Sequence, residues 1–341
     1  MSKVVLISCV KEKLNKRTKA EFLYTSDYFK LNLTYAKSLN PDKIFILSAK
    51  HGLIKLDDEI DPYEKTLNNM GVKERKKWAS KVVDSIGYET DIKEDEFVIL
   101  AGGKYREFLL DKITNYKIPM KELGIGDKLK WLLCHKMYNW IHTLPRYSFP
   151  FEKETIPKNG IYILFEKGEK YNQFDRVVRI GTHNGQDNLP KRLTEHFITE
   201  NKDRSIFRKN IGRAILNRDN DSFIHEWNID LTAKVAREEY KEKIDLNYIK
   251  NIEKKVTDYI QNYFSFVIIE IAEKEERLYY EKKLISLFSN CKFSYPSNEW
   301  LGNYSPKKKI RESGLWQEQE LWKKSLTGKE MDMLINNKLR R

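Results

Sequence analysis

The chain has 341 residues, of which 40% are apolar and 12% are aromatic. This composition can bury a core, so it excludes a mainly disordered protein, and the length predicts two domains. Lysine and arginine outnumber aspartate and glutamate by 63 to 50, which gives a net charge of +13. The excess is spread over both halves and favours a polyanionic partner such as nucleic acid.

The cysteines and the N-terminal segment bear on where the protein works. Cys9, Cys134 and Cys291 are widely separated and odd in number, so they form neither a disulfide framework nor a four-ligand zinc site. The apolar run at residues 4–10 is too short to span a membrane, and no small-residue cleavage site follows it. We therefore expect a cytoplasmic protein without a membrane partner.

The first half alternates short apolar runs with helical patterns. Strands are predicted at residues 3–10, 43–49 and 97–101, and helices at about 27–38, 73–86 and 128–142. Because consecutive parallel strands need helical crossovers, this order predicts a Rossmann-like parallel α/β domain over residues 1–145. The two-proline segment at residues 144–150 marks its end.

The second half, residues 146–341, has a different pattern. Two predicted strands, at residues 160–165 and 176–181, flank a polar stretch, which predicts a hairpin with a long loop. Further helices are predicted from residue 189 and at about 246–263 and 276–288, with a strand at about 265–271. After residue 289, turn-forming residues and three tryptophans predict an irregular, partly packed tail.

Three ordered motifs in the second half resemble a known nuclease family. They are Gly160-Ile161-Tyr162, Arg179-Ile180-Gly181 and the helix start at residues 189–196. This region, roughly residues 157–316, resembles the GIY-YIG nucleases. The resemblance implies a small α/β domain with a mostly antiparallel sheet that hydrolyses phosphodiester bonds in DNA with one divalent cation, Mg²⁺ or Mn²⁺.

The resemblance also implies residue roles. Tyr162 would be the general base or the phenol that positions water, Arg192 would hold the phosphate, and an acid on a later helix would bind the metal. Family members often place an asparagine soon after that helix. Asn298 is preferred to Asn303 because it follows the helix sooner.

Glu281 is the candidate metal ligand because of its position on a helix. Apolar residues at positions three before and three, four and seven after it place Glu281 on the apolar stripe: Leu278, Leu284, Ile285 and Phe288. A carboxylate there needs a compensating partner, and Mg²⁺ would serve. The alternative is a buried glutamate paired with an arginine or lysine.

Arg192 belongs to a helix that begins with Pro190 in its first turn. Backbone N–H groups and the guanidinium could then face one phosphate. The alternative is an arginine that points to solvent. His196, one turn later, would neighbour Arg192 or contact DNA, unless it is an ordinary buried histidine.

Two departures from the family pattern affect the mechanism. Arg179 stands where the second motif has tyrosine, and Thr182 stands where repair-type members have lysine. Tyr162 would then do the proton work alone, or His183 would substitute, or the domain would bind without cutting. The sequence leaves all three open.

Two basic segments are candidate nucleic-acid-binding surfaces. Their candidate contacts are Arg204 and Arg208, on one face of a predicted helix at residues 203–213, and Lys307 and Lys308, in the basic run at residues 305–311. Trp300 and Trp316 flank the second segment and suit wedging between bases. Ordinary solvated charges and packed tryptophans are the alternatives.

Polar residues in the first half follow the predicted strands. Those proposed to share a pocket are Ser8, Cys9, Ser48, Lys50, His51 and Tyr105. The carboxyl ends of parallel strands meet at one edge of an open α/β sheet, where such proteins bind ligands. We therefore expect one pocket at this edge.

Segments 8–13, 23–26, 47–53 and 61–63 resemble an uncharacterised bacterial domain family, distantly similar to the peroxide-stress protein YaaA, over most of residues 2–140. This implies recognition of a base or nucleotide, with glycosylase-like folds as a looser analogy. Recognition without chemistry and catalysis are both open. Cys9 would be a nucleophile only if His51 activates it, and a buried thiol is the alternative.

The sequence therefore predicts a two-domain, metal-dependent DNA endonuclease whose first domain recognises or processes a base. Restriction, phage defence and repair are the settings that fit, with modified or unmodified DNA as the partner. The alternatives are a nucleic-acid-binding protein that does not cut and a glycosylase-like enzyme with strand cleavage at the abasic site. The sequence does not determine the target or the oligomeric state.

Overall fold

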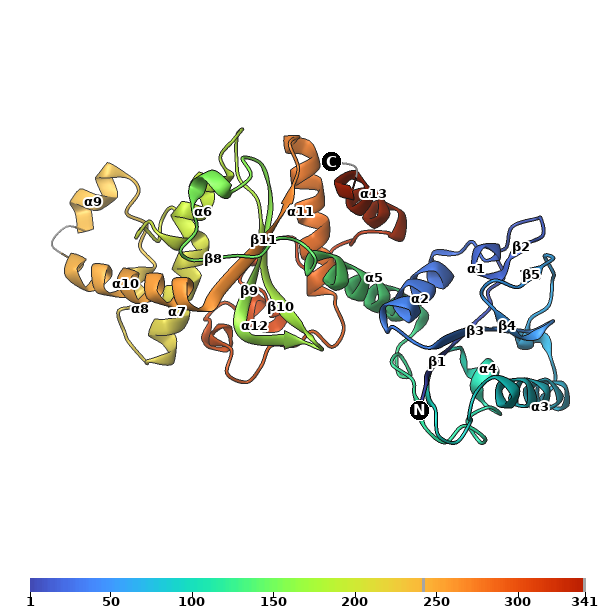
Figure 1. Cartoon of the computed structure of the whole chain (residues 1–341). Helices are drawn as coiled ribbons and strands as arrows, with labels where there is room; N and C mark the ends of the chain where they lie inside the picture. Colours follow the sequence, from blue (N-terminus) through green and yellow to red (C-terminus); the bar gives the residue numbers. More distant parts are fainter. Residues whose placement is uncertain (241–242, 340–341) are drawn as a thin grey trace. The chain divides into compact units, whose positions relative to one another are not determined.

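The computed structural model describes residues 1–240 and 243–339. The chain divides into two compact units, Met1–Lys136 and Met137–Arg341, and each is described by itself (Figure 1). Both units combine helices with a sheet, so the predicted α/β class is confirmed. Within the described residues, no helix combines the length and the apolar character that crossing a bilayer requires.

The first unit is built on a five-stranded sheet in the order β4-β3-β1-β6-β7. Its strands are β1 (Lys3–Ser8), β3 (Lys43–Ser48), β4 (Gly52–Lys55), β6 (Glu96–Leu100) and β7 (Tyr116–Lys117). The central strand β1 pairs in parallel with both β3 and β6, as predicted. Its residues Val4, Val5 and Leu6 are fully buried, which explains their unbroken apolar run.

The edge strand β4 was not predicted. It runs antiparallel to β3, and a tight turn between Ser48 and Gly52 connects the two strands. Gly52 has a φ of 79°, a backbone conformation that favours glycine. The chain therefore folds back directly after Ser48 instead of crossing over.

The three long helices of the first unit agree with the predictions at about residues 27–38, 73–86 and 128–142, whereas the short helices at residues 20–23 and 103–106 were not predicted. The helices are α1 (Ala20–Leu23), α2 (Asp27–Ser38), α3 (Val72–Glu89), α4 (Gly103–Arg106) and α5 (Ile125–Ile141), with the short elements β2 (Thr18–Lys19), β5 (Glu59–Ile60) and η1 (Leu67–Asn69). Ser26 caps α2, since its hydroxyl accepts a hydrogen bond from the Phe29 N–H at 3.3 Å. The division at residues 136/137 falls inside α5, whereas the sequence placed the boundary at residue 145.

The second unit contains a four-stranded antiparallel sheet in the order β10-β9-β11-β8. Its strands are β8 (Tyr147–Ser148), β9 (Gly160–Tyr171), β10 (Phe174–Gly181) and β11 (Phe264–Glu270). The prediction of a long hairpin loop at residues 166–175 is wrong, because β9 and β10 continue through most of these residues. Polar residues there are buried in pairs: Glu169 accepts two hydrogen bonds from Arg176, at 2.9 and 2.6 Å.

Figure 1 shows the helices of the second unit. They are α6 (Leu189–Phe197), α7 (Ile206–Arg218), α8 (Ile224–Trp227), α9 (Lys234–Tyr240), α10 (Leu246–Tyr263), α11 (Lys274–Ser289), α12 (Lys308–Ser313) and α13 (Gly328–Leu339), with η2 (Lys153–Thr155) and η3 (Leu301–Tyr304). One apolar core joins the sheet to α6, α7, α10 and the tail. The segment after residue 289 therefore includes two helices and is more regular than predicted.

Trp300 and Trp316 belong to this core and are 2% and 0% exposed. Both indole N–H groups donate to the same carboxylate oxygen of Glu166, each at 2.8 Å. The suggestion that these two side chains wedge between bases is wrong, since they are packed inside the unit.

Candidate functional site

A cavity of about 370 Å³ lies in the second unit where β10 ends. It is lined by residues after β10, on α6 and on α11: Thr182, His183, Asn184, Asn188, Lys191, Arg192, Glu195, Leu278 and Glu281. The fold thus brings Arg192 and Glu281, 89 positions apart by their numbers, to one cavity. The family resemblance had implied that these two residues act at one site.

Glu281 is partly buried on α11 beside the end of β10. Its Oε1 accepts a hydrogen bond from the Thr182 N–H at 3.0 Å. Burial raises the pKa of Glu281, opposed by the Thr182 N–H and the nearby Arg179 cation. Among the described residues no lysine or arginine forms an ion pair with this carboxylate, in contrast to the buried-ion-pair alternative.

Arg192 is held by two acceptors and is 25% exposed in its side chain. Its Nη1 donates to Glu195 Oε2 and to the Arg204 carbonyl oxygen, both at 2.9 Å. These contacts fix the direction of the guanidinium and use one of its nitrogens. The remaining N–H groups stay available to an anion in the cavity.

Tyr162 is not among the residues that line the cavity, and it is 1% exposed. Its hydroxyl is 2.8 Å from His196 Nε2, and His196 Nδ1 is 2.7 Å from the Ser205 hydroxyl. The phenol also packs against Gly181, where an added Cβ would overlap the Tyr162 oxygen. The next residue, Thr182, donates to Glu281, so Gly181 and Thr182 link the phenol to the cavity wall.

His196 is fully buried, which agrees with the alternative of a satisfied core histidine more than with DNA contact. Its pKa lies well below 6.5, first because of burial and then because Arg192, Arg179 and Arg208 are close. The imidazole is therefore neutral at pH 7. A neutral ring can accept a hydrogen bond from the Tyr162 hydroxyl or donate one to it, depending on its tautomer.

His183 lines the cavity although it is 3% exposed. It lies beside the backbone of Asn184, yet within the described part of the chain neither ring nitrogen makes a well-formed hydrogen bond. Burial lowers its pKa, and the Arg277 cation adds to the effect. The sequence pointed to His183 only as a replacement for the missing tyrosine.

Arg179 and Asn298 do not line the cavity. Arg179 is 6% exposed, and its Nη1 donates to the Trp316 carbonyl oxygen. Asn298 is exposed in a loop, where its carbonyl accepts from the Asn303 side chain at 3.1 Å. Both were sequence candidates for the reaction, and the structure puts neither into contact with the cavity.

Arg208 was predicted to hold DNA phosphates, and this is wrong because it is fully buried. Its guanidinium donates to Glu253 Oε2 at 3.1 and 2.7 Å and to the Thr257 hydroxyl at 2.7 Å. Arg204 is exposed, but it precedes α7, which begins at Ile206. The two arginines therefore do not share a helix face.

Lys307 and Lys308 stay accessible at the start of α12. Lys307 is 3.8 Å from Glu318 and Lys308 is 3.5 Å from Glu312. Such exposed pairs are weak, so both ammonium groups can exchange a carboxylate for a phosphate.

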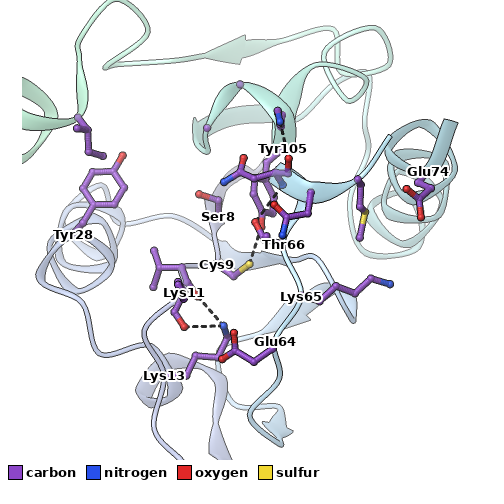
Figure 2. A pocket seen from close by; sticks show the side chains of 18 of the residues that line it. Ser8, Cys9, Lys11, Lys13, Tyr28, Glu64, Lys65, Thr66, Glu74 and Tyr105 are labelled. Atoms are coloured by element: carbon purple, nitrogen blue, oxygen red, sulfur yellow. Dashed lines mark hydrogen bonds between the residues drawn. The ribbon is translucent and has the colours of Figure 1, made fainter. Parts of the chain in front are cut away.

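The first unit contains a cavity of about 880 Å³ at the carboxyl ends of β1 and β6 (Figure 2). Ser8, Cys9 and Tyr105 line it, as expected for the edge of a parallel sheet. Figure 2 shows the Cys9 thiol facing the Tyr105 hydroxyl, at 3.1 Å. Burial raises the pKa of Tyr105, so this phenol stays protonated.

The other three predicted pocket residues do not line this cavity. Ser48 is fully buried and donates to the Tyr63 hydroxyl at 2.8 Å. Lys50 and His51 are exposed in the turn to β4, where the His51 ring packs edge-on against Tyr63 at 5.3 Å. The expectation failed for them because β3 turns back into β4 instead of crossing over.

Comparison with known families assigns the second unit. The profile of the GIY-YIG domain matches residues 143–337, more than half of the chain. The chain belongs to the GIY-YIG family, which confirms the resemblance of its second half. Such domains are endonucleases, so membership indicates a hydrolase acting on nucleic acid.

Residues 4–133 match DUF6884, a family of unknown function. The similarity to YaaA is not shown by this match and stays a prediction. Searches of curated proteins and of solved structures found no match to the chain.

Proposed function

We propose that the protein is a metal-dependent DNA endonuclease whose second unit hydrolyses the phosphodiester and whose first unit recognises a base. One observation carries the first part: a carboxylate without an ion-pair partner, Glu281, shares a cavity with an oriented arginine, Arg192. Carboxylate and guanidinium are the two groups that a metal-assisted attack on phosphate requires.

The donor set fits a hard divalent cation. Mg²⁺ and Mn²⁺ prefer oxygen ligands, and protein Mg²⁺ sites often use one or two carboxylates with water and substrate phosphate. Glu281 would be the ligand, and Glu195 also lines the cavity. The described residues contain no cluster of three or more His, Cys, Asp or Glu that could hold a metal ion, so the single-carboxylate arrangement is the one proposed. When bound, the cation would polarise the phosphate.

The remaining roles follow from side-chain placement. Arg192, with Lys191 beside it, would hold the phosphate oxygens through its free N–H groups. Tyr162 would help to orient the attacking water, with its own hydroxyl held by a hydrogen bond to neutral His196. His183 is the candidate proton acceptor, because it lines the cavity and neither of its ring nitrogens makes a well-formed hydrogen bond within the described residues.

A second candidate function is nucleic-acid binding without cleavage. It is favoured by Arg179, which stands where the second motif has tyrosine and donates to the Trp316 carbonyl oxygen, and by Tyr162, which is buried and is not among the residues that line the cavity. Cleavage at an abasic site after base removal by the first unit is a third. Restriction, phage defence and repair are the settings proposed for the endonuclease.

The test is cleavage of plasmid and linear DNA, modified and unmodified, with Mg²⁺, with Mn²⁺ and with a chelator. Glu281→Gln should abolish cleavage and leave DNA binding nearly unchanged, because it removes the anionic ligand but keeps the shape. The matched control is Glu275→Gln, which alters an exposed carboxylate on the same helix. Metal-independent cleavage, or full activity of Glu281→Gln, would refute the endonuclease site as proposed. Release of free base would favour the third function.

A further inference from the structure

The cavity of the first unit carries an excess of positive charge. Its lining includes five lysines and two glutamates: Lys11, Lys13, Lys65, Lys104, Lys128, Glu64 and Glu74. The difference is three positive charges around one concave surface. Clefts lined by one sign of charge raise the local concentration of ligands of the opposite sign.

Two of these lysines are oriented by the backbone. The Lys13 ammonium donates to the carbonyls of Val10 and Lys11, at 2.9 and 3.1 Å, and the Lys104 ammonium donates to the Asn68 carbonyl at 2.8 Å. Neutral carbonyl acceptors hold the ammonium in place without cancelling its charge. Each group is therefore positioned for an anion.

The same cavity offers surfaces that suit a heterocyclic base. Tyr28 and Tyr105 contribute aromatic rings, and Figure 2 shows Tyr28 on one side of the cavity with Cys9 and Tyr105 nearer its centre. Amide and hydroxyl groups that can form hydrogen bonds with base edges also line it: Ser8, Thr66, Asn68 and Asn69. Aromatic rings next to a few polar groups are typical of base recognition.

The backbone after β6 is open to a ligand. Gly102 and Gly103 line the cavity, and an added Cβ on either would meet no atom within 4 Å. A ligand can therefore approach this backbone closely, and a side chain added at Gly103 would start in open space. This gives a way to block the cavity and keep the fold.

We propose that this cavity binds a nucleoside phosphate, with the phosphate held by the lysines and the base placed against the tyrosines. The cavity volume, about 880 Å³, lies within the range of small-molecule sites, roughly 300–1,000 Å³. The proposal deepens the base recognition assigned to the first unit and rests on that function, but it does not depend on cleavage. The nucleotide comes either from solution or from a strand.

Calorimetric titration of the full-length protein tests the site. The probes are the four deoxynucleoside 5′-monophosphates, the matching nucleosides and inorganic phosphate, all at one salt concentration. At least one nucleotide should bind about tenfold or more tightly than its nucleoside, since a charge-assisted hydrogen bond contributes that much. Equal affinity for nucleoside and nucleotide would contradict the proposal that the lysines bind the phosphate.

Variants locate the binding. Gly103→Leu should abolish nucleotide binding, and the double variant Lys11→Ala/Lys65→Ala should weaken it about tenfold or more. The control Lys81→Ala removes an exposed lysine of α3 that does not line the cavity. Circular dichroism checks that Gly103→Leu is folded. Nucleotide binding that survives Gly103→Leu would reject this cavity.

A final experiment distinguishes a free nucleotide from a nucleotide within a strand, and the cavity of the first unit from the endonuclease site of the second. Titration with a short single-stranded oligonucleotide is done in the Glu281→Gln background, so cleavage does not interfere. Oligonucleotide binding that Gly103→Leu weakens, with no binding of free nucleotides, assigns the site to a unit of a strand. Absence of both kinds of binding overturns the proposal, whatever the cleavage assay shows. Nucleotide binding in a protein that does not cut would sink only the endonuclease function.

Discussion

Glu253 and Glu281 show how the partner decides what a buried carboxylate does. Burial raises the pKa of both. Glu253 has the Arg208 guanidinium at 2.7 Å, which completes a structural ion pair. Glu281 accepts a hydrogen bond from the Thr182 N–H and forms no ion pair within the described residues. The two side chains are alike in chemistry and differ in their neighbours.

Gly181→Ala should reduce cleavage at least about tenfold while DNA binding is retained. A Cβ at this position would overlap the Tyr162 hydroxyl and push it away from His196, and small displacements of reacting groups are costly. Single-turnover cleavage rates and DNA affinity measure the two effects. The control is Gly126→Ala, where the added Cβ meets nothing within 4 Å. Wild-type rates for Gly181→Ala would mean that the phenol has no part in the reaction.

His135 should make the protein sensitive to acid. It is 4% exposed on α5, and burial lowers its pKa from 6.5 to about 4. Below pH 6.5 the histidine of the unfolded chain binds a proton, while the native histidine stays neutral down to about pH 4. The free energy of unfolding is therefore highest above pH 6.5 and falls as the pH decreases toward 4. Between pH 7 and 5 the loss is about 2 kcal/mol.

Urea unfolding at pH 7 and pH 5 measures this effect. His135→Leu should lose about 2 kcal/mol less than the wild type between the two values. His225→Leu, at an exposed position, serves as the control. An identical pH dependence in wild type and His135→Leu would contradict the assignment.

At the scale of elements, a buried ion pair joins α7 to α10. Arg208→Met should cost about 3–5 kcal/mol, because it leaves Glu253 buried without a cation. Arg218→Met breaks an exposed pair with Asp219 at the end of the same helix and should cost less than about 1 kcal/mol. Urea midpoints give the comparison. Equal costs would show that α7 and α10 do not depend on the pair.

The double variant Arg208→Met/Glu253→Met separates the charge from the packing. Removing both partners takes away the uncompensated carboxylate, so the double variant should recover much of the stability lost in Arg208→Met. A double variant no more stable than Arg208→Met would place the cost in lost packing.

Periodicity predicted the elements that bury one face against the sheet. The helices α2 and α10 have the predicted bounds, and the parallel strands β1, β3 and β6 agree within two residues. The polar hairpin extension and α12 were missed. Polar residues of the hairpin pair with each other across it, as Arg176 does with Glu169, and an apolar pattern does not reveal such pairs.

Residues of the candidate site in the second unit could be predicted where helical periodicity places a polar side chain among core positions. Glu281 was chosen for a carboxylate among core positions, and it lines the cavity. The prediction for Arg208 was wrong because it assumed a helix with an exposed face, whereas α7 is buried on nearly all sides. His183 follows a strand in a loop, where no periodicity indicates burial.

At the scale of the whole molecule, the net charge of +13 predicts DNA binding that weakens steeply with salt. Arg204→Ala and Lys308→Ala should each lower the slope of log affinity against log salt by about 1, because each removes one phosphate contact. Fluorescence anisotropy between low and moderate salt measures the slope. Lys81→Ala serves as the control, and slopes that match it would leave Arg204 and Lys308 as ordinary solvated charges.

The Glu166 carboxylate ties the end of the chain to the middle of the sheet. Its hydrogen-bond donors are Tyr259, Trp300 and Trp316, and the last two come from the segment after α11. A truncated protein that ends after α11 would therefore keep a buried anion and lose two of its donors. A shortened second unit that keeps all three donors must include Trp316, although the cavity residues end at Glu281.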